Sequence, residues 1–243
     1  MSVPRTQSLT RAVTLLRAME RFPGGASTAA LARVTELAPA TAGRLLTTLA
    51  DAGFVERGAA GWTVGAELVR LAQRADPHRA LARRAQPVLD DLAAGAGESA
   101  LLAVPRSGPA LDIIAQADGP RLLGLTNWVG RAIDLHASAA GKLVLAELSD
   151  RALTAWIARE RPARLTQRTL VTRNALLAEV RRVRRQGWAE IDEESEPGLA
   201  SIAVGVRHPD GALAAMVGFS GPRDRLDRKR LLVPLQRAAG LLP

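Results

Sequence analysis

Apolar residues between Ser27 and Val55 recur with the spacing of two short helices joined by a turn. In the second predicted helix the apolar side chains fall within an arc of roughly 100°. A stripe of that width docks one face of a helix on a small core. The opposite face carries short hydroxyls and one guanidinium, with no acidic residue. The inward residues are Ala42, Leu45, Leu46 and Leu49, and the outward ones are Thr41, Arg44, Thr47 and Thr48.

The flanking residues favour a specific motif over an ordinary surface helix, which is the alternative for an isolated amphipathic segment. Ser27 suits the N-cap of the first helix, and Pro39 suits the first turn of the second. After Gly53, a glycine-bearing turn separates two short runs of β-forming residues, 54–57 and 62–64, which predicts a hairpin. Two helices followed by a hairpin indicate a winged helix-turn-helix, whose second helix enters the major groove of DNA.

The remaining pattern predicts a mixed α+β domain with an antiparallel sheet, because strands come first, helices follow and strands end the chain. Proline disfavours helix in the residue before it, so the Asp76-Pro77-His78 break marks a domain boundary. The expected helices cover residues 8–20, 65–74, 81–94, 139–148, 152–159 and 176–186, and the expected strands cover 99–104, 110–117, 121–127, 200–207 and 212–220.

Composition narrows the class of protein only moderately. The formal net charge of +9, carried almost wholly by Arg, suits a polyanionic partner, although Arg and Ala abundance is also typical of a GC-rich genome. The basic excess is spread over both halves of the chain, so it does not locate a DNA-binding surface. The absence of Cys excludes disulfides, thiolate nucleophiles and Cys-type zinc sites. The start, MSVPRTQSLT, lacks a signal-peptide core, and no apolar run reaches roughly 18 residues, so a soluble, cytoplasmic protein without a membrane partner is expected.

Several spaced motifs occur in a recognisable order. They are Q-S-L-x-R-A from Gln7, T-A-G-R-L-L-T-T-L-A-D-A-G-F-V from Thr41, V-G from Val129, L-H-A-S-A-A-G-K from Leu135, T-L at Thr169, R-x-x-G-W around Gly187, D-E-E at Asp192, G-L-A-S-I-A-V-G-V from Gly198 and S-G-P at Ser220. With these motifs the chain resembles the IclR family of bacterial transcriptional regulators over nearly its full length.

The resemblance implies an α+β protein: an N-terminal winged helix-turn-helix over residues 1–64, a linker helix over 65–77 and a GAF-like mixed α/β effector-binding domain over 78–243. It also implies a homodimer or a dimer of dimers on a palindromic operator of double-stranded DNA. A small organic acid is expected to modulate occupancy, and repression is expected ahead of activation. A rival from another class is a ligand-sensing or partner-binding protein whose winged helix mediates protein contacts.

The DNA-contacting candidates follow from the outward face of the second helix. Arg44 is expected to read guanine, and Thr41 and Thr48, with Thr47 beside them, to contact phosphate or thymine methyl groups. Arg57 in the hairpin and Gln7 near the N-terminal arm are candidate backbone contacts. The chain departs from many relatives in having Pro39-Ala40 before Thr41 and Gly43 before Arg44. Gly43 weakens the helix by roughly 1 kcal/mol relative to Ala, so the operator sequence does not follow from relatives.

An effector pocket is expected where small residues begin the helix near residue 139, because unpaired backbone N–H groups at a helix N-terminus bind carboxylates. A tight helix–sheet packing contact is the alternative. Ser201 stands where relatives commonly have Cys, which favours a more strongly hydrogen-bonding ligand. The candidate pocket residues are Leu122, Leu125, Trp128, Ile133, Ala139, Ala140, Gly141, Asp192, Leu199, Ser201, Gly218 and Ser220.

The acidic residues between 190 and 196 are expected to form a solvated loop by default. If Asp192 or Glu194 turns into the pocket instead, its charge repels an effector carboxylate. The ligand then needs a hydroxyl or amino group to offer that side chain. The hypothesis that follows is a hydroxylated or amino-bearing acid.

Enzymatic patterns are weak in this chain. Ser138 and Lys142 are four residues apart, which does not match the S-x-x-K nucleophile motif, and Gly141-Lys142 lacks the rest of a P-loop. Asp134, His136 and Ser138 alternate, but a catalytic triad depends on convergence in space. The three histidines, at 78, 136 and 208, lack metal-ligand spacing. We therefore expect no enzyme activity, no cofactor and no metal.

Overall fold

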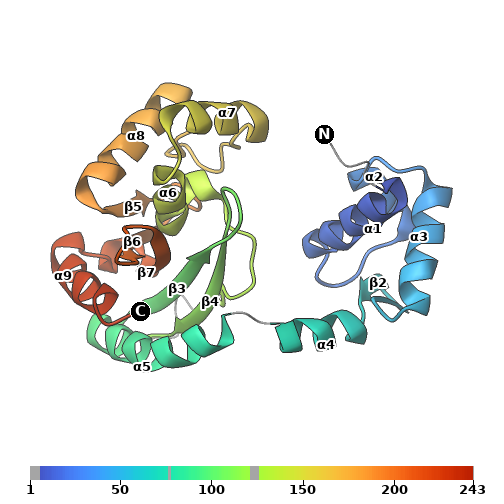
Figure 1. The fold of residues 1–243 in the computed structure, drawn as a ribbon, viewed down its shortest axis with the longest axis horizontal. Helices are drawn as coiled ribbons and strands as arrows, with labels where there is room; N and C mark the ends of the chain where they lie inside the picture. Colours follow the sequence, from blue (N-terminus) through green and yellow to red (C-terminus); the bar gives the residue numbers. More distant parts are fainter. Residues whose placement is uncertain (1–5, 76–77, 121–125, 243) are drawn as a thin grey trace. The chain divides into compact units, whose positions relative to one another are not determined.

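The computed structural model describes residues 6–75, 78–120 and 126–242, and the chain divides into two compact units, Met1–Pro77 and His78–Pro243 (Figure 1). Each unit has its own hydrophobic core. Within the described ranges, no helix is both long enough and apolar enough to cross a membrane.

The N-terminal unit is a winged helix-turn-helix, as predicted. Its core is built from buried side chains of the first three helices and the two strands, including Leu15, Leu31, Leu46 and Trp62. The first helix is shorter than expected and passes into a 3-10 turn. The elements are α1 (Gln7–Ala18), η1 (Met19–Arg21), α2 (Thr28–Val34), α3 (Pro39–Asp51), the antiparallel strands β1 (Val55–Gly58) and β2 (Gly61–Val64), and α4 (Ala66–Ala75).

The C-terminal unit is an α+β domain around one five-stranded antiparallel sheet with the order β4-β3-β7-β6-β5. The strands are β3 (Ser99–Pro105), β4 (Leu111–Ala117), β5 (Trp188–Asp192), β6 (Leu199–Arg207) and β7 (Leu213–Pro222). The helices are α5 (Arg79–Ala96), η2 (Leu135–Ala137), α6 (Ala139–Ala146), α7 (Asp150–Glu160), α8 (Arg173–Gln186), η3 (Arg223–Arg225) and α9 (Arg228–Ala239).

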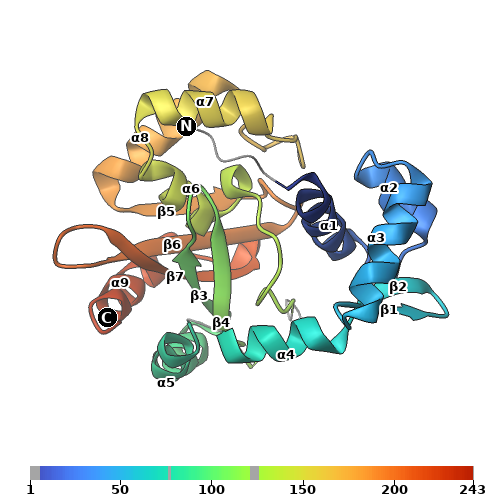
Figure 2. The same cartoon turned by 45° about the vertical axis from the view of Figure 1, so that its right-hand side comes forward.

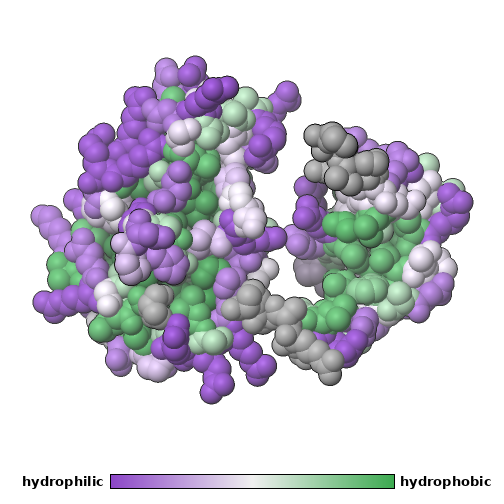
Figure 3. Space-filling model, in the orientation of Figure 1, coloured by the Kyte–Doolittle hydropathy of each residue, from purple (hydrophilic) through white to green (hydrophobic). Residues whose placement is uncertain are grey.

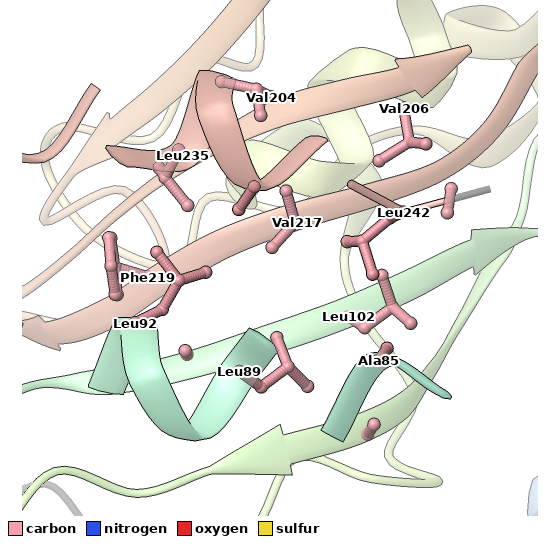
Figure 4. Close-up of a cluster of buried hydrophobic side chains, with 14 of the residues drawn as sticks. Ala85, Leu89, Leu92, Leu102, Val204, Val206, Val217, Phe219, Leu235 and Leu242 are labelled. Atoms are coloured by element: carbon pink, nitrogen blue, oxygen red, sulfur yellow. The ribbon is translucent and has the colours of Figure 1, made fainter. Parts of the chain in front are cut away.

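Helices cover both faces of this sheet, in three layers (Figure 2). Helices α5 and α9 pack on one face, where side chains such as Leu89, Leu235 and Phe219 form a buried cluster (Figure 4). Helices α6, α7 and α8 lie on the other face and bury a second cluster with Leu143, Trp156 and Val180. The cavity described below lies on this second face.

The sequence-based prediction missed β5 and α9. Strand β5 alternates buried Ala189 and Ile191 with half-buried polar positions. The acidic residues in and after this strand concealed its two-residue period in the sequence. Helix α9 contains Pro234, which argues against helix from sequence alone. Most of the strand expected at 121–127 falls on residues outside the described ranges, and Thr126 and Asn127 lie in no strand.

The acidic stretch is not simply a solvated loop, because Glu194 is buried with its carboxylate against the ammonium of Lys142. Lys142 lies on α6 and is 1% exposed. Its Nζ donates to Glu194 Oε1 at 2.6 Å, to Glu179 Oε1 at 3.0 Å and to the carbonyl oxygen of Glu190 at 3.0 Å. One ammonium thus joins α6, α8, β5 and the segment that follows β5.

The two carboxylates respond differently to this burial. Desolvation raises the pKa of Glu194, and the opposing attraction of Lys142 only partly offsets it. Burial also acts to raise the pKa of Glu179, but hydrogen bonds and charges from Arg182 and Lys142 outweigh it and lower the pKa. Because Glu194 Oε2 is buried without a hydrogen-bond partner, Lys142 is the main group that makes this carboxylate tolerable inside the fold.

We predict that Lys142→Met destabilises the protein by about 3–5 kcal/mol, because it leaves the buried carboxylate of Glu194 without its counter-charge. The variant also removes an influence that lowers the pKa of both glutamates. A folded-state pKa above the unfolded value costs stability as pH rises, so the loss should grow above about pH 4.5, the ordinary glutamate value. Urea unfolding of the full chain at about pH 5 and about pH 7 measures both effects.

The matched control is Lys229→Met, which changes the chain's other lysine at an exposed position on α9. This variant should stay within about 0.5 kcal/mol of the unchanged protein. A loss below about 1 kcal/mol for Lys142→Met at both pH values would contradict the central role of this ammonium.

Candidate functional site

Helix α3 presents a polar face on the N-terminal unit. Ala42 and Leu46 are buried in the core, whereas Arg44, Thr47 and Thr48 are exposed. Thr41, on the first turn, is half-buried. The structure therefore brings three of the predicted DNA-contacting side chains together on one outward surface.

The N-terminal part of the motif is held by local capping, as predicted. Ser27 is the N-cap of α2, and its hydroxyl accepts a hydrogen bond from the amide of Ala30 at 3.2 Å. Helix α3 has a proline in its first turn, Pro39. Between the two helices, Glu36 has a φ of 54°, a left-handed conformation that lets the chain turn sharply.

The wing is attached to the start of α2 through Trp62. Its indole Nε1 donates to Thr28 Oγ1 at 2.9 Å, and its backbone exchanges hydrogen bonds with Ala26 at 2.8 and 3.1 Å. The guanidinium of Arg57 lies over the Trp62 ring, 5.6 Å from its centroid. Trp62 thus supports both the wing and Arg57, a role that the β-forming pattern of the hairpin did not reveal.

The last DNA-contacting candidate, Gln7, is the first residue of α1 and is exposed. It belongs to a different element from the cluster on α3. Gln7 therefore lies at the start of α1, on a different element from both α3 and the wing.

The C-terminal unit contains a mostly apolar cavity between the sheet and α6. Its empty space is about 770 Å³, counting the part open to solvent. Of the predicted pocket residues, those that line it are Trp128, Ile133, Ala139, Ala140, Leu199, Ser201, Gly218 and Ser220.

The sheet side of the cavity carries two serine hydroxyl groups and a glycine. Ser201 on β6 and Ser220 on β7 are directly paired across the strands, so their side chains share one face at close range. Gly218 is the partner of Ala203. A Cβ at Gly218 would lie 2.5 Å from the carbonyl oxygen of Ile202, so no larger residue fits there without moving the sheet.

The N-terminus of α6 forms the opposite wall. Ser138 is the N-cap, and its hydroxyl accepts from the Gly141 amide at 3.1 Å. The first amides of a helix have no partner within it, and Ala139 and Ala140, which carry two of them, line the cavity. The cavity thus lies between the first residues of α6 and the two serines of the sheet, with mostly apolar residues and Asp134 completing its lining.

Gly141 does not line the cavity, which corrects its predicted role. A Cβ at Gly141 would lie 2.4 Å from both Leu135 Cα and Leu135 O. The glycine therefore lets η2 pack against α6, so at this position the packing alternative holds. Gly141 supports the wall without touching the space.

Asp192 does not line the cavity either. Its carboxylate is paired with the guanidinium groups of Arg168 and Arg223 on the exposed edge of β5. Glu194 faces Lys142 rather than a ligand, so neither acidic side chain acts as the sequence-based hypothesis required. The predicted residues Leu122 and Leu125 lie outside the described residues.

Sequence analysis missed the cavity residues contributed by the other strands and loops. Leu111 and Ile113 on β4 lie on its wall, with Ala103, Met216 and Ser195. The alternation of buried and half-buried positions along β4 does not identify the cavity face, because a register shift places Leu111 and Ile113 in the cavity-side cluster and Ala115 and Ala117 in the opposite one.

His136 and Ser138, which alternate with Asp134 in the sequence, have separate partners. The Nε2 atom of His136 lies 2.8 Å from the carbonyl oxygen of Ala163. Ser138 is occupied as the cap of α6. The two side chains therefore have structural roles in the fold around the cavity.

Comparison with protein families accounts for both units. Residues 8–59 match the model of the IclR helix-turn-helix domain. Residues 74–241, more than half of the chain, match the model of the bacterial transcriptional regulator IclR C-terminal domain. The chain belongs to the IclR family. The exposed face of α3 is therefore part of a DNA-binding domain, and the cavity lies in the family's ligand-binding C-terminal domain.

Individual relatives agree with this family. The chain is 31% identical to the transcriptional repressor IclR of Escherichia coli K12, covering 93% of this chain and 84% of that protein. It is 28% identical to the Pca regulon regulatory protein of Pseudomonas putida, covering 92% and 77%. A solved IclR regulator from Silicibacter sp. TM1040 has a TM-score of 0.81 at 28% identity, covering 96% and 93%.

One IclR homologue of similar fold has been solved with a small aromatic acid. It comes from Microbacterium hydrocarbonoxydans and is complexed with 4-hydroxybenzoate. The TM-score is 0.76 at 22% identity, covering 96% of each chain.

We predict that Gly141→Ala destabilises the C-terminal unit by about 1–3 kcal/mol, because the added methyl overlaps the backbone of Leu135. The control is Gly95→Ala on α5, where a Cβ meets nothing within 4 Å. That change should stabilise by up to about 1 kcal/mol through helix propensity. Thermal and urea unfolding compare the two variants. Equal stability would contradict the close contact between Gly141 and the backbone of Leu135.

Proposed function

We propose that this IclR-family regulator represses transcription by binding a palindromic operator through α3, and that a small organic acid in the C-terminal cavity changes operator occupancy. Residues 1–64 are assigned to DNA binding, 65–77 to the linker helix and 78–243 to effector binding. Because bacterial DNA lies in the cytoplasm, the protein is assigned there. The exposure of Arg44, Thr47 and Thr48 on a helix whose other face is buried is the observation that carries the proposal.

Arg44 has the main base-reading role in this proposal. Arginine forms bidentate hydrogen bonds with guanine in the major groove, and Arg44 is the one long cationic side chain on α3. Thr41, Thr47 and Thr48 contact bases or phosphates beside it. Arg57 on the wing and Gln7 at the start of α1 position the unit through the phosphate backbone, which orients a protein without specifying sequence.

Exposed apolar side chains support the proposed homo-oligomer. Leu9 and Val13 on α1 are 66% and 40% exposed, and Val69 and Leu71 on α4 are 49% and 41% exposed. Figure 3 shows apolar surface over these helices. Exposed apolar side chains on these helices are available for contacts with a second copy of the chain. A dimer, alone or in pairs, would also match a palindromic operator, because two-fold protein symmetry is mirrored in paired half-sites.

The cavity supports an acid that carries a second polar group. Amides at the start of α6 suit a carboxylate, the walls suit an apolar body, and Ser201 and Ser220 suit a hydroxyl or amino group at the far end. Because Asp192 and Glu194 have other partners, we assign recognition of the second polar group to the two serines.

We predict that Arg44→Ala weakens specific DNA binding by about 1–3 kcal/mol, because the guanine contact is lost. The probe is a duplex selected by the unchanged protein from a randomised pool, with affinity measured by fluorescence anisotropy at fixed salt. Arg83→Ala, which removes an exposed arginine from α5 in the other unit, is the control for charge. Equal affinity of Arg44→Ala and the unchanged protein for the selected duplex would refute the role of Arg44.

Salt dependence tests DNA binding itself. Release of counterions makes the logarithm of the binding constant fall linearly with the logarithm of salt concentration. We expect a steep fall for the unchanged protein. A nearly flat dependence, or failure to enrich any duplex, would favour a winged helix that binds protein.

We predict that acids with a hydroxyl bind more tightly than their plain analogues, by about 3- to 10-fold, because one extra hydrogen bond contributes about 1 kcal/mol. Calorimetry of the full chain compares pairs that differ by one hydroxyl, beginning with 4-hydroxybenzoate and benzoate. In the double variant Ser201→Ala, Ser220→Ala the preference should disappear. Equal affinities within every pair for the unchanged protein would contradict the role of the two serines.

A further inference from the structure

Two outward threonines of α3 have already used their only hydrogen-bond donor. Thr47 Oγ1 donates to the carbonyl oxygen of Gly43 at 3.0 Å, and Thr48 Oγ1 donates to that of Arg44 at 3.0 Å. Both side chains are exposed. A threonine hydroxyl carries one hydrogen, so neither can donate to a base or a phosphate without breaking a helix-side hydrogen bond.

These hydrogen bonds also decide what each side chain offers to the outside. When Oγ1 turns back to a carbonyl four residues earlier, the methyl group occupies another position on the same Cβ. The β-branched side chain is stiff about χ1, and the hydrogen bond holds it in one rotamer. Each of these exposed side chains therefore carries a methyl group held in one position.

We propose that Thr47 and Thr48 recognise the C5-methyl group of thymine by apolar contact, so that each operator half-site carries thymine close to the guanine read by Arg44. This inference rests on the proposed function, since it requires α3 in the major groove. It deepens that function by naming the base that the threonines select.

The rest of α3 supports apolar recognition. Adenine is usually read by Asn or Gln, and neither occurs between Pro39 and Asp51. At the start of the helix, the exposed residues are Ala38, Pro39 and Ala40, which offer methyl or methylene groups and no side-chain donor. Apart from Arg44, the outward surface of this helix is thus suited to the methyl groups that distinguish thymine in the major groove.

The experiment removes the thymine methyl without changing base pairing. The full-length protein first selects duplexes from a randomised pool, and each thymine of the tightest duplex is then replaced singly by deoxyuridine. Binding is measured by fluorescence anisotropy at one salt concentration. At one or more thymines in a half-site, we expect affinity to fall about fourfold, which corresponds to ~0.8 kcal/mol for one buried methyl group.

Protein variants test which part of each threonine makes the contact. Thr47→Ser and Thr48→Ser keep the hydroxyl and remove the methyl, so the preference for thymine over deoxyuridine should vanish at the matching position. Thr47→Val and Thr48→Val keep a methyl and remove the hydroxyl, so the preference should persist. Coupling between the protein and DNA changes isolates the contact from other effects of each substitution.

Helix α1 offers a matched control. Thr14 is exposed, and its Oγ1 donates to the carbonyl oxygen of Thr10 at 2.9 Å, the same arrangement on another helix. Thr14→Ser should leave the preference for thymine unchanged. Circular dichroism of all variants checks that the helices are retained.

Three results would overturn the proposal, and they are distinguishable. If no duplex is enriched, DNA recognition by α3 fails and this inference fails with it. If duplexes bind specifically but no deoxyuridine substitution weakens binding, the proposed function stands and methyl recognition is wrong. If the valine variants lose the preference while the serine variants keep it, the hydroxyl oxygen reads the base and methyl recognition is again wrong.

Discussion

The buried ammonium of Lys142 is the interaction on which the C-terminal unit depends. It reaches Glu194 and Glu179 and the Glu190 carbonyl, which lie on elements about 40 to 50 residues further along the chain. A charge taken out of water is tolerated only when its partners are placed accurately. That requirement holds α6 at a defined position relative to β5 and the segment after it, and α6 supplies one wall of the cavity.

The two faces of the sheet serve different purposes. Toward α5 and α9, residues such as Leu102, Val217 and Phe219 form a buried cluster. Toward α6, Ala203, Gly218 and the paired serines lie beside larger residues such as Met216 and line the cavity. Close packing is the normal state of a protein interior, so a cavity that combines apolar walls with two hydroxyl groups is suited to a ligand.

In the N-terminal unit, the division of α3 into two faces links stability to recognition. Leu46 and Ala42 are buried in the core, so only the opposite side of the helix is available for contact with a partner. Back-donation by Thr47 and Thr48 then removes two donors from that surface. Trp62 contributes from the wing by binding Thr28 at the start of α2 and by lying beneath Arg57. In the proposed function, this unit therefore recognises DNA with one arginine among mostly apolar groups.

The sequence alone was sufficient for the features that depend on neighbours a few residues apart. The amphipathic period of α3, the Ser27 cap, the glycine-bearing hairpin and most strands of the sheet were predicted because helix and strand periods and caps act locally. Tertiary structure alone decided the burial of Glu194, the pairing of Asp192 with two arginines, the packing role of Gly141 and the existence of β5 within the acidic stretch. Each of these depends on which distant segment lies opposite. Lys142 and Glu194, for example, are 52 residues apart, and no local pattern distinguishes a carboxylate that meets a buried ammonium from one that meets water.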